Sequence, residues 1–490
     1  MTQQQLSWAD RFRGAMLGGA VGDAVGAGVR NTSTAEIQQW FGPRGVADYL
    51  PVYGRRGAAT DLSQLTVFTL EGLLRAKAAG AGGLPTEFVF TNHLRWLHTQ
   101  GVPWEYAMAA SLNTEPAPAS WLLERRELYS TRNPAGYVLA LLGRMAARSP
   151  LGADGRLYPP VSWDGAADFA VWAAPAMVWS NVPEGVYSAG AAIANLCTSG
   201  ANSIAAAGLH ADVLAQLIRG IPLWDALTAS DQRRLNTAYP VAGVPADVRR
   251  TVHAAMFVGQ RGALPRPVDI DIEFDVVDKP GELGIALAAV GGTRTFADAV
   301  QVAVNHSADS AVTGALAGQL AGALHGPASI PPQWLHDLEL REVLDVLCQD
   351  ATEAFAPPPP PQWAQRYVGE PQQNAPRRLA APERTVEGSG EQTMVLPAIP
   401  AEEPAPAEPS AETARRSVPV EEPPPFEPAA SSAGAATFPA PPVPQVGDAE
   451  STAVFAAVGT EESAPRDRTP IEFEVPEPAA EPDPEPEPEP

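Results

Sequence analysis

A short polar turn that carries an acid is the first feature of the sequence that could support chemistry. The turn runs from Asn305 to Asp309, and a helix rich in small residues follows it, with Gly314, Gly318 and Gly322 spaced four residues apart. Small residues at this spacing make one helix face nearly flat, so other backbones can pack closely against it. Carboxylates act as general acids or bases and bind hard cations. We therefore expect the Asp309 carboxylate to point into the centre of the protein.

A second acid lies at the expected start of another helix. Thr60 and Asp61 directly precede a stretch in which apolar and small residues recur at steps of three and four, namely Leu65, Phe68, Gly72, Leu73 and Ala76. This periodicity predicts a helix. Either Thr60 or Asp61 is a natural N-cap for it, so helix capping is an alternative to a role in chemistry.

A third acid, Asp23, lies in the Gly- and Ala-rich stretch Asp10 to Gly26, which is expected to be an N-terminal helix. Its spacing is not G-x-G-x-x-G and no strand precedes it, so it is not a dinucleotide-binding loop. Because the neighbours of Asp23 are small and apolar, the residue is expected to be buried. It either braces the following loop or contacts a ligand.

The elements that must position these acids are mainly helices. Helical periodicity recurs from residue 81 to residue 355, interrupted by turns rich in Pro and Gly. The stretch Asp269 to Val277 alternates apolar and acidic residues, which indicates either a short strand or an exposed loop. No βαβ rhythm and no repeat of fixed period is visible. The sequence therefore predicts an all-α fold.

The C-terminal part of the chain has a different composition. Residues 356–490 contain 31 of the 52 prolines, and 24 Asp and Glu residues stand against 8 Arg and Lys, a net charge of −16 within the total of −24. Such a segment cannot bury enough apolar surface to offset the entropy lost on ordering. We expect one folded domain over residues 1–355 and a disordered Pro-, Ala- and Glu-rich tail over residues 356–490.

Charge and cysteine content exclude several classes of function. The acidic balance argues against nonspecific binding of nucleic acid and against docking on anionic lipid. Cys197 and Cys348 have no metal-ligand spacing and are expected to be buried free thiols. Residues 1–10 show no signal peptide, and no stretch is apolar enough to span a membrane. The chain is expected to be cytoplasmic.

Four separated segments resemble the ADP-ribosylglycohydrolase family, which includes the dinitrogenase reductase-activating glycohydrolases. Arg11 to Gly26 resembles the opening motif R-x-x-G-x-x-x-G-x-x-x-G-D-x-x-G. Thr60 to Gln64 lies where the family has T-D-D-T-Q, and Asn305 to Gly314 lies where it has N-H-S-G-D-S-D-S-T-G. Ile330 to Leu335 resembles the closing I-P-x-x-W. The resemblance covers about residues 8–355 and implies a compact helical bundle with its site in a central cleft.

The resemblance also implies a reaction and a cofactor. The family hydrolyses an N- or O-glycosidic bond at the ribose of an ADP-ribosyl group, and its two acidic segments bind a pair of Mg²⁺ ions. Of the six ligand positions, half match here and half have become apolar; the matching residues are Thr60, Asp61 and Asp309, and the apolar ones are Leu62, Ala311 and Val312. Losing even a partner of a ligand weakens metal binding. We expect the dinuclear site to be lost and Mg²⁺ to be bound weakly or not at all.

Three further residues are candidates for contact with an ADP-ribose-like ligand: Asp23, Arg30 and Ser307. Arg30 stands where some family members have an acid. Its side chain either reaches a phosphate of the ligand or lies in solvent at the surface, and the solvated position is expected.

Three functional hypotheses follow. In the first, the chain is a pseudoenzyme that binds an ADP-ribose-like ligand or an ADP-ribosylated protein, or serves as a scaffold. In the second, it is a divergent hydrolase with a reduced metal site, in which Asp61 and Asp309 form an acid/base pair. In the third, the tail carries the function through Thr393 and Thr452, since the segment around Thr452 resembles the phosphoacceptor segment of small forkhead-associated-domain proteins. Phosphothreonine there would bind an arginine-bearing reader such as a forkhead-associated domain.

Overall fold

The computed structural model describes residues 6–109, 118, 120–132, 142, 146, 166–234, 246–274, 280–356 and 362–367. All of them belong to one compact unit of the chain. Helices make up nearly all of their regular structure, and the one β-type contact among them is an isolated bridge between Val52 and Arg55. None of the helices in these ranges is both long enough and apolar enough to cross a bilayer. The all-α class predicted from the sequence is confirmed.

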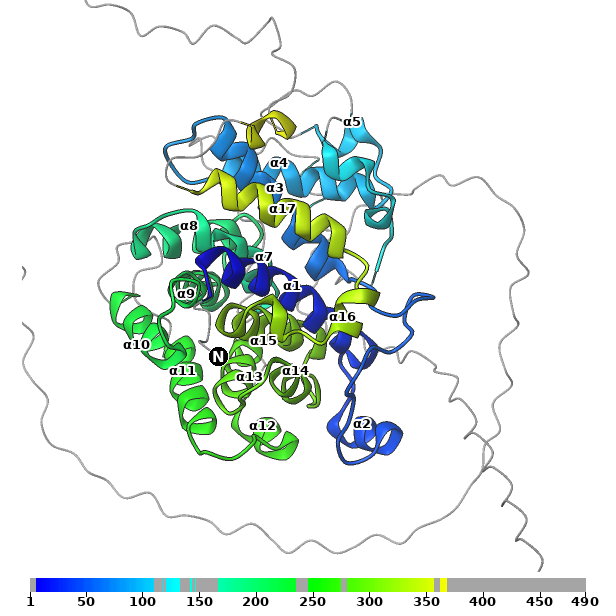
Figure 1. The fold of residues 1–490 in the computed structure, drawn as a ribbon, viewed down its shortest axis with the longest axis vertical. Helices are drawn as coiled ribbons and strands as arrows, with labels where there is room; N and C mark the ends of the chain where they lie inside the picture. Colours follow the sequence, from blue (N-terminus) through cyan, green and yellow to red (C-terminus); the bar gives the residue numbers. More distant parts are fainter. Residues whose placement is uncertain are drawn as a thin grey trace, which may run out of the picture. The chain divides into compact units, whose positions relative to one another are not determined.

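Sixteen α-helices are assigned in these ranges (Figure 1), and they are, in chain order, α1 (Trp8–Gly26), α2 (Thr34–Phe41), α3 (Asp61–Ala78), α4 (Thr86–Thr99), α5 (Trp104–Ala107), α7 (Asp168–Ala173), α8 (Pro183–Asn195), α9 (Ala201–Leu217), α10 (Leu223–Arg234), α11 (Ala246–Gly259), α12 (Pro267–Glu273), α13 (Gly281–Gly291), α14 (Phe296–Val304), α15 (Ser310–His325), α16 (Pro332–Asp337) and α17 (Arg341–Ala354). A 3₁₀ turn, Ala27–Val29, continues α1, and another, Trp363–Arg366, follows α17.

Helix α15, the small-residue helix, lies at the centre of the fold. Every residue from Ser310 to Ala323 is buried. It packs against α1, α13 and α14 along its length, and also contacts α7, α9 and α3. On either side of this centre, α3 packs with α4 and α17, and α9 packs with α7, α8 and α10 (Figure 1). The acids at the start of α3 and α15 are therefore brought into the middle of the protein.

The contact between α1 and α15 is a seam of glycines. A Cβ atom added at Gly18 would lie 2.2 Å from the carbonyl oxygen of Gly318, and one at Gly22 would lie 1.8 Å from that of Gly314. The same relation holds at Gly14, where the Cβ would lie 2.3 Å from the oxygen of Gly322. Because the backbones touch directly, no larger residue fits on this face. The flat helix face expected from the sequence is thus present, and α1 is its partner.

The stretch around Asp269 is not a strand or a loop. It forms α12, which begins with Pro267 at its first turn. Ile270 is fully buried and Phe274 is 6% exposed, whereas Ile272 is 78% exposed. Burial of residues four apart is typical of a helix. The alternation in sequence was misleading because Ile272, one of the three described apolar residues of the stretch, faces solvent.

The packed part of the chain continues past the domain boundary expected at residue 355. Trp363 and Tyr367 are buried, and the Tyr367 hydroxyl donates a hydrogen bond to Asp350 of α17. The position of the boundary and the disordered tail stay predictions, since residues 357–361 and 368–490 lie outside the described residues. Both free thiols, Cys197 and Cys348, are buried as expected.

Candidate functional site

Asp309 caps the central helix and reaches across to another element. One of its carboxylate oxygens, Oδ1, accepts hydrogen bonds from the backbone N–H groups of Ala311 (3.1 Å) and Val312 (3.2 Å). The other, Oδ2, accepts a hydrogen bond of 2.8 Å from Nε of Arg30. The side chain is thus an N-cap of α15, which satisfies two N–H groups that lack partners in the helix. As expected from the sequence, the carboxylate points inward, and Asp309 is only 6% exposed.

Asp23 organises the start of α3. Its carboxylate accepts four hydrogen bonds, from the backbone N–H and hydroxyl of Thr60 (3.0 and 2.6 Å) and from those of Ser63 (3.3 and 2.5 Å). The Thr60 hydroxyl in turn accepts from the N–H of Leu62, as a helix N-cap does. Burial raises the pKa of Asp23, although these hydrogen bonds oppose the rise. All four contacts are made to the N-cap and first turn of α3, so within the protein Asp23 braces the start of this helix.

Arg30 is not in solvent, so the expected position of its side chain is wrong. The residue follows the 3₁₀ turn that continues α1, and its side chain is only 5% exposed. Its guanidinium lies between two acids: Nε is 2.8 Å from Oδ2 of Asp309, and Nη1 is 3.1 Å from Oδ1 of Asp61. Burial alone would lower the pKa of Arg30, but the two carboxylates hold it above its ordinary value. A positive charge is therefore fixed between the acids of the two expected site segments.

Asp61 is the most buried member of this arrangement. It is 0% exposed, and its second carboxylate oxygen, Oδ2, has no hydrogen-bond partner. Burial raises the pKa of Asp61 to about 7, although attraction to Arg30 opposes the rise. Asp168, the first residue of α7, contributes to this rise through its negative charge. The loss of hydration on burial disfavours the ionised form of Asp61 more than the hydrogen bond from Arg30 favours it.

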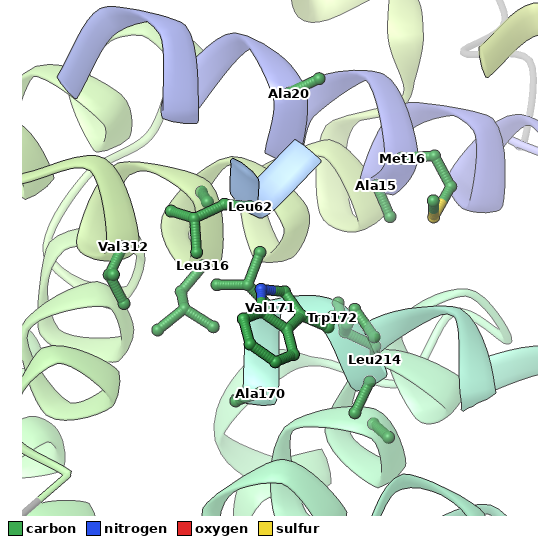
Figure 2. Close-up of a cluster of buried hydrophobic side chains, with 14 of the residues drawn as sticks. Ala15, Met16, Ala20, Leu62, Ala170, Val171, Trp172, Leu214, Val312 and Leu316 are labelled. Atoms are coloured by element: carbon green, nitrogen blue, oxygen red, sulfur yellow. The ribbon is translucent and has the colours of Figure 1, made fainter. Parts of the chain in front are cut away.

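Apolar side chains lie beside these acids. Leu62 and Val312 are each 0% exposed and belong to the continuous apolar core. Figure 2 shows that Leu62, Val312 and Leu316 lie near one another, with Val171 of α7 on the adjacent side. The apolar residues at the expected ligand positions thus belong to the same core cluster as Val171, and their helices α3 and α15 both pack against α7. These residues are part of the buried core of the protein.

Ser307, the remaining residue expected to contact a ligand, lies on the outer side of the turn. It is exposed, and its N–H and hydroxyl both donate to Asp271 of α12 (2.9 Å each). The hydroxyl of Thr34, at the start of α2, donates to the same carboxylate at 2.6 Å. The polar groups of Ser307 are therefore engaged within the protein, and the structure brings together only Arg30, Asp61 and Asp309 from the expected set, with Asp23 and Thr60 beside them.

Comparison with known proteins identifies the family. A profile described as ADP-ribosylglycohydrolase matches residues 4–361. The chain belongs to the ADP-ribosylglycohydrolase family. A solved structure entitled "ADP-ribosylglycohydrolase-related protein complex" matches with 22% sequence identity and a TM-score of 0.46, covering 74% of this chain and 99% of that one. No curated protein sequence matched.

The residues present do not fit the pair of Mg²⁺ ions that the ADP-ribosylglycohydrolase family implies. Hard cations need several oxygen ligands each. Here Thr60 is committed to Asp23, Asp309 is committed to Arg30 and to the helix start, and Leu62 and Val312 offer no oxygen. Within the described ranges no group of three or more His, Cys, Asp or Glu residues is placed to bind a metal. A guanidinium between the two acids would also repel any cation placed beside it.

Sequence reasoning missed one member of this site, Asp168, and placed another, Arg30, in solvent. Arg30 was singled out, but nothing in its neighbours indicates that the chain turns it inward. Asp168 could have been found from the sequence, because it is a single acid within the apolar stretch Ala166 to Val171. The same pattern, an acid among small and apolar residues, indicates Asp23. The contact of Asp271 with Ser307 could not be predicted either, because the segment of Asp271 was not expected to be helical.

Proposed function

We propose that this ADP-ribosylglycohydrolase family member does not hydrolyse ADP-ribosyl bonds and serves as an ADP-ribose-type ligand-binding or scaffolding module. The observation that carries the proposal is the position of Arg30, whose guanidinium bonds both residual acids at 2.8 and 3.1 Å. Two Mg²⁺ ions bring four positive charges, and Arg30 adds a fifth. Asp61 and Asp309 supply two negative charges and the nearby Asp168 a third, which is fewer than the five positive charges, so a dinuclear centre would be repelled.

The geometry also disfavours acid/base chemistry by Asp61 and Asp309 without metal. A general acid or base must come within hydrogen-bond reach of the proton that it transfers. Asp61 is fully buried, and both carboxylate oxygens of Asp309 accept hydrogen bonds from donors within the protein. The raised pKa of Asp61, about 7, is suitable for proton transfer, but burial is its cause and the same burial separates the group from substrate. This is the reason to rank a divergent hydrolase second.

The direct test is a hydrolysis assay. Full-length protein is incubated with peptides that carry ADP-ribosyl-arginine or ADP-ribosyl-serine, with millimolar MgCl₂ and with EDTA. A family enzyme that keeps all six ligand positions serves as positive control. We expect no release of ADP-ribose above the rate without protein. Mg²⁺-dependent release would overturn the proposal. Release that is equal in EDTA and is abolished by Asp309→Ala would establish the divergent hydrolase in its place.

The ligand is tested by calorimetric titration of the full chain with ADP-ribose, with and without Mg²⁺. Binding of the same affinity in both buffers supports a ligand-binding module, and an ADP-ribosylated protein is then the natural partner to test. Absence of binding in both buffers leaves the scaffolding role. Binding that requires Mg²⁺ contradicts the loss of the metal site.

A scaffolding role would give the tail a function. Thr393 and Thr452 lie outside the described residues, so their role as phosphorylation sites stays a proposal that rests on sequence alone. Phosphate at Thr452 in protein from native cells, with retention of the chain on an immobilised forkhead-associated domain, would support it. Retention should be lost in Thr452→Ala and kept in Ser451→Ala. Complete absence of phosphate at both threonines would refute it.

A further inference from the structure

Three elements that are far apart in the chain meet at Arg30. The side chain comes from the end of the α1 extension, and it joins Asp61 at the first residue of α3 to Asp309 at the N-cap of α15. Both acids lie at helix N-termini, where the helix dipole favours negative charge. Two ionised carboxylates close together in a buried place nevertheless repel, and a cation between them offsets this repulsion.

We propose that the Arg30 guanidinium is a built-in cation that takes the place of a bound metal ion between Asp61 and Asp309, and that removing it uncovers a latent site for one divalent cation. The inference rests on the proposed loss of two-metal hydrolysis, and its test reads binding and stability, so the two can fail separately.

Arg30 links acids on different helices through its positive charge, as a structural metal ion does. A planar guanidinium donates in fixed directions and bonds carboxylates on two sides, which a lysine ammonium does less well. Here it connects the start of α3, the start of α15 and the end of the α1 extension, with both bonds at ordinary lengths of 2.8 and 3.1 Å. Since the cation is part of the chain, its presence does not depend on the concentration of any metal.

A second observation points to a cation at the same place. Oδ2 of Asp61 is buried and has no hydrogen-bond partner, so this carboxylate retains an unused acceptor beside Arg30. Asp168 lies near enough to act electrostatically on both Arg30 and Asp61. Without Arg30, these carboxylates form a concentration of negative charge that a divalent cation such as Mg²⁺, Mn²⁺ or Ca²⁺ would neutralise, with water completing its coordination.

The experiment compares full-length wild type with Arg30→Ala. Thermal unfolding is recorded in EDTA and in millimolar MgCl₂, MnCl₂ or CaCl₂, and binding of Mn²⁺ alone is measured by electron paramagnetic resonance. We expect the wild-type Tm to be the same in all buffers and Mn²⁺ to stay free. Arg30→Ala should have a lower Tm in EDTA, recover several degrees with at least one of these metals, and bind one Mn²⁺.

Two matched variants separate this effect from general salt effects. Arg13→Ala removes an arginine whose pair with Asp345 (2.8 Å) lies at the surface, and its Tm should not respond to metal. Arg30→Ala combined with Asp309→Asn removes one ligand of the latent site, so the response to metal should disappear.

Three results would overturn the inference. The first is a wild type that binds Mn²⁺ or gains stability from it, because Arg30 then leaves room for a metal. The second is an Arg30→Ala variant that folds but does not respond to any of the three metals. The third is an Arg30→Ala variant that fails to fold both with and without metal, because an uncovered site should at least be rescued by its ion.

Discussion

The glycine seam joins α1 to α15, and the Arg30 bridge joins the segment just after α1 to the starts of α15 and α3; the two connections stabilise the fold in different ways. Along the seam, Gly18 meets Gly318 and Gly22 meets Gly314 with no side chain between them. Just past its end, Arg30 joins Asp309 through a long side chain and a charge. The seam depends on shape, and the bridge depends on electrostatic balance.

This difference explains which features of the family motifs can change. A seam glycine has no substitute, because any Cβ would meet a carbonyl oxygen about 2 Å away. A charged site has substitutes, because a guanidinium can neutralise carboxylates much as a metal ion does. In this chain the seam follows the family motif, while three ligand positions have become Leu62, Ala311 and Val312.

The largest effect is expected at the seam. Gly18→Ala places a Cβ 2.2 Å from the carbonyl oxygen of Gly318 and 2.9 Å from the Phe296 ring, so the two helices must separate. We expect a loss of more than about 3 kcal/mol in the free energy of unfolding, measured by urea denaturation. The same change at Gly82, which has nothing within 4 Å of the added Cβ, should stay within about 0.5 kcal/mol of wild type. Equal effects at the two sites would contradict the seam.

A smaller effect is expected beside the bridge. Asp23→Ala leaves the N–H and hydroxyl groups of Thr60 and Ser63 without their acceptor in a buried place. We expect a loss of about 3 kcal/mol in unfolding free energy, because each unsatisfied group costs about 1–3 kcal/mol and part of the cost is relieved by water. Ser63→Ala removes one donor only and should cost about 1 kcal/mol. If Asp23→Ala cost no more than Ser63→Ala, the bracing role would be wrong.

The third expected effect is a change in the pH dependence of stability. The folded protein raises the pKa of Asp61 from 3.8 to about 7, so it holds this proton more tightly than the unfolded chain does. The stability that this gives is complete below pH 3.8 and is lost as pH rises through about 7. Asp61→Asn should therefore remove a downward slope of up to about 1.4 kcal/mol per pH unit from the unfolding free energy in this range.

The control for this measurement is Gly82→Ala, which changes no titrating group and should keep the wild-type slope. An Asp61→Asn variant with the same slope as wild type would show that Asp61 is ionised throughout, held so by Arg30.

Most of the fold could be predicted from the sequence, because it follows from local patterns. The cap of α3 and the small residues of α1 and α15 can be read directly from the sequence, and the inward direction of Asp309 follows from its place before a buried helix. Asp269 to Val277 could not be assigned correctly, because alternation along the sequence does not reveal which apolar residues face solvent. The described part of that stretch is helical.

The site could be predicted only in part. The acids that remain and the apolar residues that replace the others were visible in the motifs. The inward turn of Arg30 was not, because it depends on where the end of the α1 extension lies relative to two helices that are distant in the sequence. No local pattern encodes such a position.

The glycine seam also dictates when the protein can fold. Arg11 of α1 donates hydrogen bonds to the backbone carbonyl oxygens of Ala323 and Leu324, which lie more than 300 positions later in the chain. Nearly the whole folded part must therefore leave the ribosome before α1 meets its partner. At about 5–20 residues per second this takes roughly 15–60 s. During that time the face of α1 that packs against α15 in the folded protein has no partner.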